Sequence, residues 1–492
     1  MCRVPTSHTA AKDFHVSAIR DELASHIKQG VIPPFNYAYP SRSAYRPLNG
    51  AWNIKDIWDE DLKRHPIPEL NLYLHVPFCR YKCGFCNLYT VISEDMDVYD
   101  AYMDALCTQI RDHAEIIQAR RLRTIYIGGG TPSLLSPKHF EQLFATFDEV
   151  YPNWRSTVEE VAIEATPDSI VKEPGTLEAL IAMGLTRANI GIQSLVPAEI
   201  REAGRGQANE QVIRRAIEIT REKQLPNLST DLIMGFAGQS PESWRHSVDE
   251  LTALAPETIS TYFLTVRPDA WFSKTGSYQY MWNPDLYERY DYANAKFREA
   301  GYIQESNVRY KKLGRGGYQQ KVLTFHGVPL LGLGAGARSY TSSVDYMVGS
   351  VKPSLTEVAD YIHKARKHEL TPQTGFVLDD EEIIRKRLVL DTFDLDLHEL
   401  DRFGYREKAH LFEPVLAAGE ELGLLRRLPT DRIQLTADGF KYRDILSWMF
   451  FSKNVIELDR EYYEKLHQQN KRAQKHMGGE PIRISGLKTT AV

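Results

Sequence analysis

The sequence predicts an α/β fold whose centre is a partial (β/α)6 barrel of parallel strands. Six short β-like runs recur between residues 71 and 264, and helical patterns separate them. Chemically distinctive residues follow several of these runs. Active sites of such barrels lie at the carboxyl ends of the strands, so these residues form the candidate site.

The six predicted strands are residues 71–76, 124–127, 160–164, 187–193, 228–233 and 258–264. Residues 97–117, between the first two, are predicted as helix because apolar residues such as Val98 and Tyr102 recur at helical spacing. Cys107 lies in this helix and is expected to be a buried structural thiol. Only six such units are present, so the predicted barrel is incomplete.

The barrel divides the chain into five parts. They are an N-terminal arm or lid (1–69), the barrel (70–270), an extension closing the site (271–372), a small α+β winged-helix-like cap (373–455) and a basic, mobile tail (456–492). Residues 36–52 are rich in tyrosine, proline and arginine, and are expected either to cover the barrel mouth or to pack as an extended arm. The aromatic side chains of residues 269–292 are expected to stack on substrate or to pack in a core.

Composition and charge argue against several classes of protein. A net charge of -5 over 492 residues gives no electrostatic reason to expect a nucleic-acid partner. The N-terminus lacks the apolar core of a secretory signal, and no uncharged stretch is long enough to span a bilayer. The expected location is the cytoplasm, with neither a nucleic acid nor a membrane as partner.

Three of the five cysteines, Cys79, Cys83 and Cys86, crowd one short loop with the spacing C-x3-C-x2-C. A structural zinc site usually has four ligands in two separated pairs, a redox dithiol needs only two thiols, and an ordinary ferredoxin cluster uses four cysteines. Three thiolates on a four-iron cluster leave one iron open to another ligand. This open-site [4Fe–4S] cluster is favoured over zinc and over a fully protein-ligated cluster. His75 precedes the loop and is expected to point away from it.

With Phe85 directly before Cys86, the cysteine spacing resembles that of the radical SAM superfamily. The resemblance implies a [4Fe–4S] cluster and S-adenosylmethionine (SAM), which together generate a 5′-deoxyadenosyl radical. Residues 70–345 further resemble the oxygen-independent coproporphyrinogen III oxidase-like family. The segments that carry this resemblance are YLHVPFCRYKCGFC, TIYIGGGTPSLL, VAIEATP, RANIGIQSL, STDLIMGFAGQSPESW and LLGLGAGARSY.

That family binds two SAM molecules, and the matching motifs imply which residues hold each one. The residues implied for the SAM that is cleaved at the cluster are Tyr73, Gly129 and Glu164. Those implied for the second SAM are Phe85, Gly130, Thr131, Gln193, Arg205 and Asp231. Arg205 would engage the carboxylate of the second SAM, and Asp231 its cationic end.

Three of these residues also have a purely structural interpretation. Gln193 is also expected as a strand cap, Arg205 as a solvated surface charge, and Asp231 as the partner of a neighbouring helix. Their shared position at strand ends favours the binding role over these alternatives.

Three positions depart from the family. Leu88 stands where the porphyrinogen-oxidising enzymes carry a further cysteine. Residues 318–327 hold His326 alone, instead of the histidine–asparagine pair of the haem-chaperone branch. Arg338 stands where related enzymes often carry an apolar residue.

The first two departures favour the class C radical SAM methyltransferases and the related cyclopropanases of natural-product pathways. In these enzymes a SAM methylene radical adds to an sp2 carbon of a substrate held close by, giving a methyl group or a cyclopropane ring. The alternative is a haem- or porphyrin-handling protein: a coproporphyrinogen III dehydrogenase, a haem-ring-opening methylase or a haem chaperone. Expected partners are a small-molecule substrate, an external electron donor such as flavodoxin, and a partner methyltransferase.

Overall fold

The six predicted parallel strands are present in the computed structural model and lie side by side in chain order. They are β2 (Glu69–Val76), β5 (Arg121–Gly129), β6 (Glu160–Ala165), β7 (Arg187–Gln193), β8 (Asn227–Met234) and β9 (Thr258–Phe263). Each pairs in parallel with the next. The structure describes residues 16–31, 35–50, 52–205, 209–267, 270–274 and 285–476.

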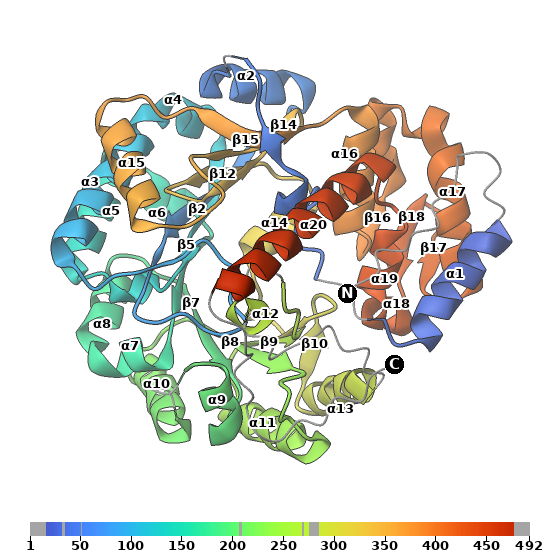
Figure 1. Ribbon diagram of the computed structural model, residues 1–492, viewed down its shortest axis with the longest axis horizontal. Helices are drawn as coiled ribbons and strands as arrows, with labels where there is room; N and C mark the ends of the chain where they lie inside the picture. The colour runs from blue at the N-terminus through green and yellow to red at the C-terminus, as the bar shows by residue number, and fades with distance from the viewer. Residues whose placement is uncertain are drawn as a thin grey trace.

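Helices connect these strands and cover the outside of the sheet (Figure 1). They are α3 (Met96–Asp112), α4 (Ala114–Gln118), α5 (Pro137–Val150), α6 (Trp154–Thr157), α7 (Pro167–Lys172), α8 (Pro174–Ala182), α9 (Pro197–Glu202), α10 (Glu210–Glu222) and α11 (Pro241–Leu254). The predicted helix over 97–117 is present as α3 and α4, which meet at His113. Cys107 is buried in α3, as predicted.

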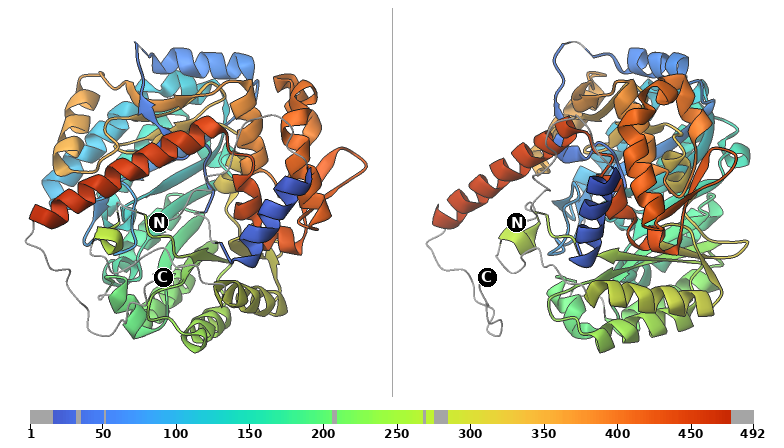
Figure 2. Two further views of the ribbon diagram at one scale, coloured as in Figure 1. Left: turned by 45° about the vertical axis from the view of Figure 1, so that its right-hand side comes forward. Right: turned by 90° about the vertical axis from the view of Figure 1, so that its right-hand side faces the viewer.

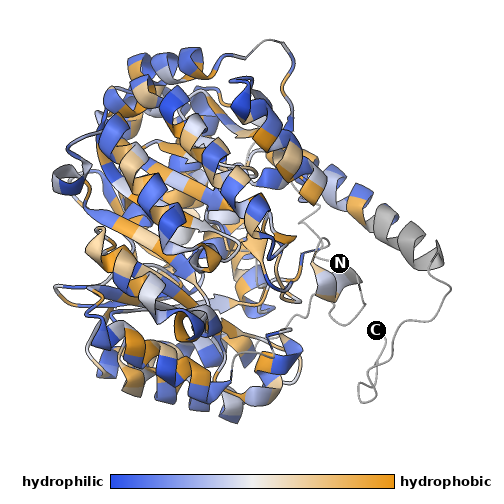
Figure 3. Ribbon diagram, turned by 90° about the vertical axis from the view of Figure 1, so that its left-hand side faces the viewer, coloured by the Kyte–Doolittle hydropathy of each residue, from blue (hydrophilic) through white to orange (hydrophobic). Residues whose placement is uncertain are grey.

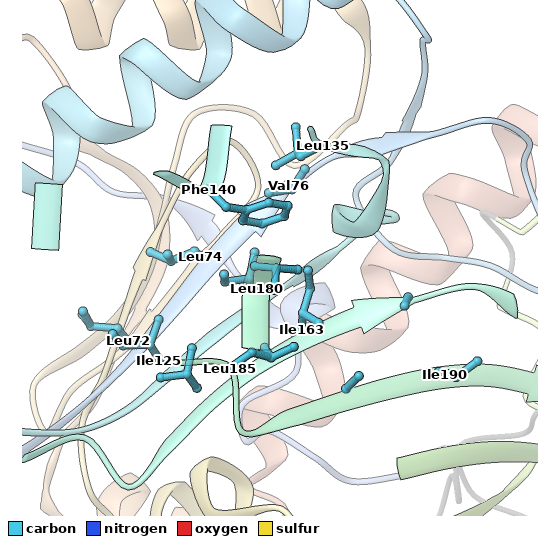
Figure 4. Close-up of a cluster of buried hydrophobic side chains, with 14 of the residues drawn as sticks. Leu72, Leu74, Val76, Ile125, Leu135, Phe140, Ile163, Leu180, Leu185 and Ile190 are labelled. Carbon is cyan, nitrogen blue, oxygen red and sulfur yellow. The ribbon is translucent and has the colours of Figure 1, made fainter. Parts of the chain in front are cut away.

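The strands alternate between an apolar outer face and a polar inner face. In β2, Leu72 and Leu74 point outward into the core, whereas Tyr73 lies on the other face, since successive side chains alternate along a strand. Figure 4 shows the outward-facing side chains packed between sheet and helices, among them Leu72, Leu74, Ile125, Ile163 and Ile190 from strands with Phe140 and Leu180 from helices. This alternation keeps the inner face free for polar chemistry.

The outer helices are correspondingly two-sided. In α10, Ile213 and Ile217 are buried against the sheet, whereas Arg215 and Glu218 are exposed. Figure 3 shows the same mixture of hydrophilic and hydrophobic stretches along the helices on the outside of the molecule. Such a stripe of apolar residues is what anchors a helix to a sheet.

Further strands extend the sheet at both ends. Beyond β9 lie β11 (Arg309–Lys312) and β10 (Tyr302–Gln304); beyond β2 lie β12 (Leu330–Leu333), β13 (Arg338–Tyr340), β14 (Val344–Val348), β15 (Pro372–Val377) and β1 (Arg46–Pro47). The two outermost strands, β1 and β10, do not pair with each other within the described residues, so the barrel is partial, as predicted. The helices of this region are α2 (Ile54–Arg64), α12 (Trp271–Lys274), α13 (Asp285–Glu299), α14 (Gln319–Phe325) and α15 (Leu355–Arg366).

A second hydrophobic core lies in the C-terminal part of the chain. Its strands β16 (Asp394–Asp396), β18 (Arg432–Leu435) and β17 (Leu425–Arg427) form a separate three-stranded sheet. Its helical elements are α16 (Asp380–Leu390), η3 (Leu397–Phe403), α17 (Tyr405–Glu421), α18 (Ala437–Lys441) and α19 (Arg443–Trp448). The N-terminal helix α1 (Val16–Lys28) packs on α17. A small α+β domain with a β-wing is therefore present, as expected for the cap.

The N-terminal arm packs into the protein. Tyr39 is fully buried, and β1 pairs with β15. The 3-10 turn η1 (Arg42–Ala44) lies between them along the chain. Of the two expectations for residues 36–52, the packed arm is observed over the described part. None of the described helices combines the length and the apolar character that a bilayer crossing requires.

The expected mobile tail is wrong for its first part, because residues 453–476 form the helix α20 (Lys453–His476). Ser41 donates a hydrogen bond of 2.7 Å to Asp459, and Arg46 donates one of 2.8 Å to the carbonyl of Leu458. Figure 2 shows α20 running across the front of the parallel sheet. Contacts with the arm thus stabilise a helix that its polar composition did not suggest. Residues 477–492, and residues 275–284 of the aromatic segment, lie outside the described residues.

A buried ion pair joins the barrel to α14. Arg187 donates a hydrogen bond of 3.0 Å to Glu160, and both side chains are about as buried as the apolar core, at 1% and 5% exposure. Glu160 also accepts hydrogen bonds from the backbone N–H groups of Gln319 and Gln320. The carboxylate therefore holds the first turn of α14 against the start of β6.

We expect Arg187→Met to lower the free energy of unfolding by about 3–5 kcal/mol, because it leaves the buried Glu160 without its counter-ion. The double variant Arg187→Met/Glu160→Met should be less destabilised than the single one, since no uncompensated charge remains. The exposed pair Arg111–Glu149 provides a control, and Arg111→Met should cost about 0–1 kcal/mol. Urea denaturation measures the free energy of unfolding of the two single variants and of the double variant. Equal losses for Arg187→Met and Arg111→Met would contradict the assignment.

Candidate active site

The cysteine loop follows β2 and is held at both ends. Its start forms β3 (Phe78–Cys79), which pairs with β4 (Val91–Ile92) at its end. In the middle, the N–H of Gly84 donates to the carbonyl of Ala203 at 3.0 Å, and the N–H of Phe272 donates to the carbonyl of Gly84 at 2.9 Å. A Cβ at Gly84 would lie 2.0 Å from the Phe272 ring, so only glycine fits between the cysteines there.

The three thiols face one cavity. Cys79, Cys83 and Cys86 all line it, and all are free cysteines. Burial raises the pKa of Cys79 to about 12, and the hydroxyl of Thr131 opposes this shift by donating a hydrogen bond to its sulfur at 3.6 Å. Burial also raises the pKa of Cys83, against the opposing positive charge of Arg205. Burial therefore favours the protonated thiols of Cys79 and Cys83 without metal, and iron would replace their protons.

The arrangement suits a multi-iron cluster better than a single ion. No three His, Cys, Asp or Glu side chains within the described residues are placed so that they could hold one metal ion together. A [4Fe–4S] cluster puts each thiolate on a different iron atom, so it does not require that its ligands converge on one point. Three thiols on one cavity wall meet this requirement.

Glycines after the second parallel strand bring the backbone against the same cavity. Gly129 has φ 115° and Gly130 lies so close to Phe78 that a Cβ would be 2.4 Å from the Phe78 carbonyl oxygen. The N–H of Gly129 donates to Glu164 at 2.9 Å, and the hydroxyl of Tyr126 donates to the other carboxylate oxygen at 2.8 Å. Burial raises the pKa of Glu164, and these two donors oppose the rise. The carboxylate is thereby fixed at the end of β6.

The ends of β7 and β8 place an amide and a carboxylate beside it. Gln193 has φ 71°, which is unusual for a residue other than glycine, and the pairing of β7 with β8 is irregular there. Such strain is commonly found at binding sites. Asn189 donates a hydrogen bond of 2.7 Å to Asp231. Burial raises the pKa of Asp231 while Asn189 lowers it.

Two opposite charges in this cavity have no ion-pair partner within the described residues. Arg205 is 4% exposed, and its Nε has no hydrogen-bond partner there. Cys83, Tyr81 and Asp168 attract its charge, and Tyr81 shares a hydrogen bond with it. Asp168 forms its ion pairs with Arg80 and Lys172.

The carboxylate of Asp231 likewise has no ion-pair partner within the described residues. The charges that attract it belong to Arg309 and Arg187, which pair with Glu305 and Glu160. A cation and an anion held apart in one cavity match a zwitterionic ligand.

The structure brings the predicted site residues together with one exception. The cavity is lined by Cys79, Cys83, Phe85, Cys86, Gly129, Gly130, Thr131, Glu164, Gln193, Arg205 and Asp231, but not by Tyr73. Tyr73 stacks on Tyr126 with ring centroids 5.9 Å apart, and Tyr126 donates to Glu164 of the cavity. The buried Arg205 is not the solvated surface charge of the structural alternative, and Asp231 bonds to a strand residue instead of a helix.

Sequence reasoning missed two residues. Asn189 lines the cavity and orients Asp231; its spacing of two and four residues from Gly191 and Gln193 in a predicted strand was the available signal. His75 does not line the cavity, but its Nε2–H donates a hydrogen bond of 2.7 Å to the carbonyl of Tyr89. Its side chain thus contacts the end of the cysteine loop, contrary to the expectation that it points away.

We expect Cys83→Ala to abolish cluster assembly, since it removes one of three thiolates. Cys107→Ala is the matched control, because Cys107 is a buried thiol of α3 far from the cavity lining. Iron and sulfide content and the visible absorption of anaerobically reconstituted protein measure the outcome. A normal cluster in Cys83→Ala, or a lost cluster in Cys107→Ala, would contradict the ligand assignment.

Comparison with known proteins agrees with this geometry. Residues 73–251 match the Radical SAM superfamily. The chain is 27% identical to the oxygen-independent coproporphyrinogen III oxidase of Bradyrhizobium diazoefficiens over 85% of this chain and 94% of that protein. It is 29% identical to a heme chaperone of Bacillus subtilis over 61% of this chain and 79% of that protein. It matches the Salmonella typhimurium coproporphyrinogen III oxidase at 28% identity over 47% of this chain, spanning only 50% of that protein.

The fold agrees as well. The crystal structure of the coproporphyrinogen III oxidase from Escherichia coli superimposes with a TM-score of 0.70 at 21% identity, covering 85% of this chain and 96% of that one. Sequence motifs, cavity and fold therefore agree: residues 73–251 of this chain match the Radical SAM superfamily, and the chain is similar to oxygen-independent coproporphyrinogen III oxidases and heme chaperones.

Proposed function

We propose that this protein binds two SAM molecules beside one [4Fe–4S] cluster and uses the 5′-deoxyadenosyl radical to remove a hydrogen atom from a porphyrinogen-type substrate. The observation that carries the proposal is the cavity in which three thiols, the unpaired Arg205 and the unpaired Asp231 face one another. When bound, the cluster supplies the electron that cleaves SAM.

The residues of β5 and β6 suit the SAM that is cleaved. The carboxylate of Glu164 accepts from Tyr126 and Gly129, and two carboxylate oxygens retain lone pairs for ribose hydroxyls. The backbone at Gly129 and Gly130 can approach a ligand closely because no Cβ intervenes. Tyr73 contacts this group of residues through its stacking on Tyr126.

The residues of β7, β8 and the segment after α9 suit the second SAM. Arg205 would pair with its carboxylate, and Asp231 would face its sulfonium or ammonium group. Phe85, next to the third cysteine, and Gln193, in its strained conformation, line the space between them. Because neither charge has an ion-pair partner in the described residues, neither has to give one up when the ligand binds.

The relatives favour porphyrin chemistry over the methylation that the sequence motifs suggested. The Bradyrhizobium diazoefficiens oxidase aligns over nearly its whole length, which includes the regions outside the radical SAM match. Removal of a hydrogen atom from a propionate side chain, followed by loss of CO2 and of one electron to an external acceptor, would give a vinyl group. The electron donor for the cluster would likewise be external, such as flavodoxin.

A second candidate function is methylene transfer from the second SAM to an sp2 carbon, giving C-methylation or cyclopropanation of a natural-product intermediate. The observation that favours it is Leu88, which lines the cavity and is 45% exposed, at the position where porphyrinogen-oxidising relatives carry a cysteine. A leucine can neither donate a proton nor bind metal there. Both candidates use the same two SAM positions, and a partner methyltransferase would accompany only the second.

We expect the reconstituted protein to bind two equivalents of SAM and Asp231→Asn to bind one. Loss of a charge-assisted hydrogen bond should weaken the second site about 10- to 100-fold. Equilibrium dialysis with labelled SAM measures the stoichiometry. Asp360→Asn, at an exposed carboxylate of α15, is the matched control and should bind two. One equivalent in the wild type, or two in Asp231→Asn, would contradict the two-site arrangement.

Turnover with methyl-trideuterated SAM separates the two reactions. With coproporphyrinogen III as substrate, we expect unlabelled 5′-deoxyadenosine and a decarboxylated product without deuterium. Methylene transfer would instead put one deuterium into 5′-deoxyadenosine and a CD2 unit into a product. Mass spectrometry measures the deuterium content of 5′-deoxyadenosine and of the product. SAM cleavage without decarboxylation of coproporphyrinogen III would refute the first candidate.

A further inference from the structure

Two partly buried basic side chains have no carboxylate partner within the described residues. Arg338 in β13 and Lys321 in α14 both contact Tyr37 of the N-terminal arm. The guanidinium of Arg338 donates to the Tyr37 hydroxyl at 2.9 Å, and the ammonium of Lys321 donates to the Tyr37 carbonyl at 2.9 Å. Their charged groups also lie 5.1 Å and 4.8 Å from the centre of the Tyr37 ring. Neither forms an ion pair within the described residues; Asp345, which attracts Arg338, pairs with Lys386.

Other buried cations of this region do have carboxylate partners. Arg309 pairs with Glu305 at 3.2 Å, and Arg443 pairs with Asp444 at 2.7 Å. The lack of an ion-pair partner within the described residues distinguishes Arg338 and Lys321 from these two arginines, and Arg205 of the cavity shares it. Placing two basic side chains close together without a counter-ion is unfavourable for stability, so this arrangement suits the binding of an anion.

The surroundings of Lys321 disfavour its charged form and contain further cations. Burial lowers the pKa of Lys321 well below its ordinary value, and the positive charges of Arg309, Arg338 and Arg443 lower it further. Burial would raise the pKa of the Tyr37 phenol, yet the charges of Arg338, Arg267 and Arg42 lower it to about 8. The region around Tyr37 therefore carries a positive potential.

The pair lies next to the inner wall of the barrel. A Cβ at Gly332 of β12 would be 2.2 Å from the carbonyl of Arg338, and Gly332 pairs directly with Tyr73 of β2. The charge of Arg338 lowers the pKa of Tyr73, which burial raises. Tyr73 stacks on Tyr126, which bonds to Glu164 in the cavity. Because Gly332 carries no side chain, nothing from that strand separates Arg338 from Tyr73.

The side chains of Arg338 and Lys321 are partly exposed to solvent. Both have intermediate exposure, and the same holds for Tyr37, Tyr73 and Tyr340 around them. Their aromatic neighbours offer flat apolar faces beside the two cations; Arg338 lies 5.7 Å from the ring centre of Tyr340. Cations beside aromatic faces suit a ligand that combines a planar, apolar body with carboxylates.

We propose that Arg338 and Lys321 form an anion subsite that binds a carboxylate of the substrate and thereby orients it toward the radical SAM cavity. The assignment rests on the proposed function, which supplies a substrate with propionate side chains. Lys321 would gain its proton as the carboxylate binds, because the new negative charge offsets the surrounding cations. Closure of the substrate region would then involve the arm residue Tyr37, which already joins both cations.

Binding of coproporphyrin III, a tetracarboxylate, is compared with binding of its uncharged tetramethyl ester, using fluorescence titration of the cluster-loaded full chain. The wild type should prefer the acid. Arg338→Met and Lys321→Met should each weaken acid binding about 10- to 100-fold and leave ester binding nearly unchanged. Arg338→Lys should restore part of the preference, since it returns the charge. Lys55→Met, at an exposed lysine of α2, is the control and should match the wild type.

Tyr37→Phe tests whether Arg338 serves only to anchor the arm. This variant removes the hydroxyl that accepts the Arg338 hydrogen bond but keeps both charges, so the preference for the acid should persist. Loss of acid and ester binding alike in Arg338→Met, or an unchanged acid preference in both charge variants, would overturn the subsite.

A wrong proposed function and a wrong subsite would give different experimental results. If the wild type binds neither porphyrin, both the subsite and the porphyrinogen substrate are refuted, whereas the two-equivalent SAM stoichiometry is measured independently of either. If the wild type prefers the acid and the charge variants do not, the subsite stands even where coproporphyrinogen III is not decarboxylated.

Discussion

The common direction of six parallel strands is the constraint on which the site depends. Because all six run the same way, their carboxyl ends meet at one rim, and residues separated by up to 150 positions in sequence become neighbours. Cys79 after β2, Gly129 at the end of β5, Glu164 in β6 and Asp231 in β8 meet in one cavity for this reason. The outer apolar face of each strand, packed under helices, keeps this rim in place.

The inner surface of the barrel carries more charge than its stability requires. Where the charge serves the fold, it is paired: Arg187 with Glu160 fixes the start of α14, and Arg309 pairs with Glu305. Where it faces the cavity or the arm, it is not: Arg205, Asp231, Arg338 and Lys321 have no ion-pair partner among the described residues. Since leaving a buried charge unpaired costs free energy, this division separates supporting residues from candidate ligand-binding residues.

The N-terminal arm and helix α20 belong to this inner surface as much as to the exterior. The arm brings Tyr37 against two cations of the barrel extension, and α20 bonds to the arm through Asp459 and Leu458. Elements from both ends of the described chain are thus coupled to each other and, through Tyr37, to β13 and α14. A ligand that contacts Tyr37 would affect the arm, β13 and α14 together, because Tyr37 is hydrogen-bonded to Arg338 and Lys321.

Much of this architecture was readable from the sequence by itself. The six strands were predicted within a few residues of their observed bounds, because apolar and β-branched runs report strand structure locally. The cysteine spacing identified the cluster loop, and the strand-end positions of Gly129, Glu164, Gln193 and Asp231 identified the rim. These features depend on residues that are close in sequence.

Tertiary structure alone decided the remainder. That Arg205 is buried, that Tyr73 stacks on Tyr126, and that Tyr37 meets Arg338 about 300 positions away all depend on how distant segments pack. The tail from residue 456 has a polar composition typical of a mobile segment, yet its first part is helical because the arm supplies hydrogen-bond partners. The spacing of apolar residues in the sequence indicates which face of a helix or strand is buried, but it does not indicate which distant residue will contact that face.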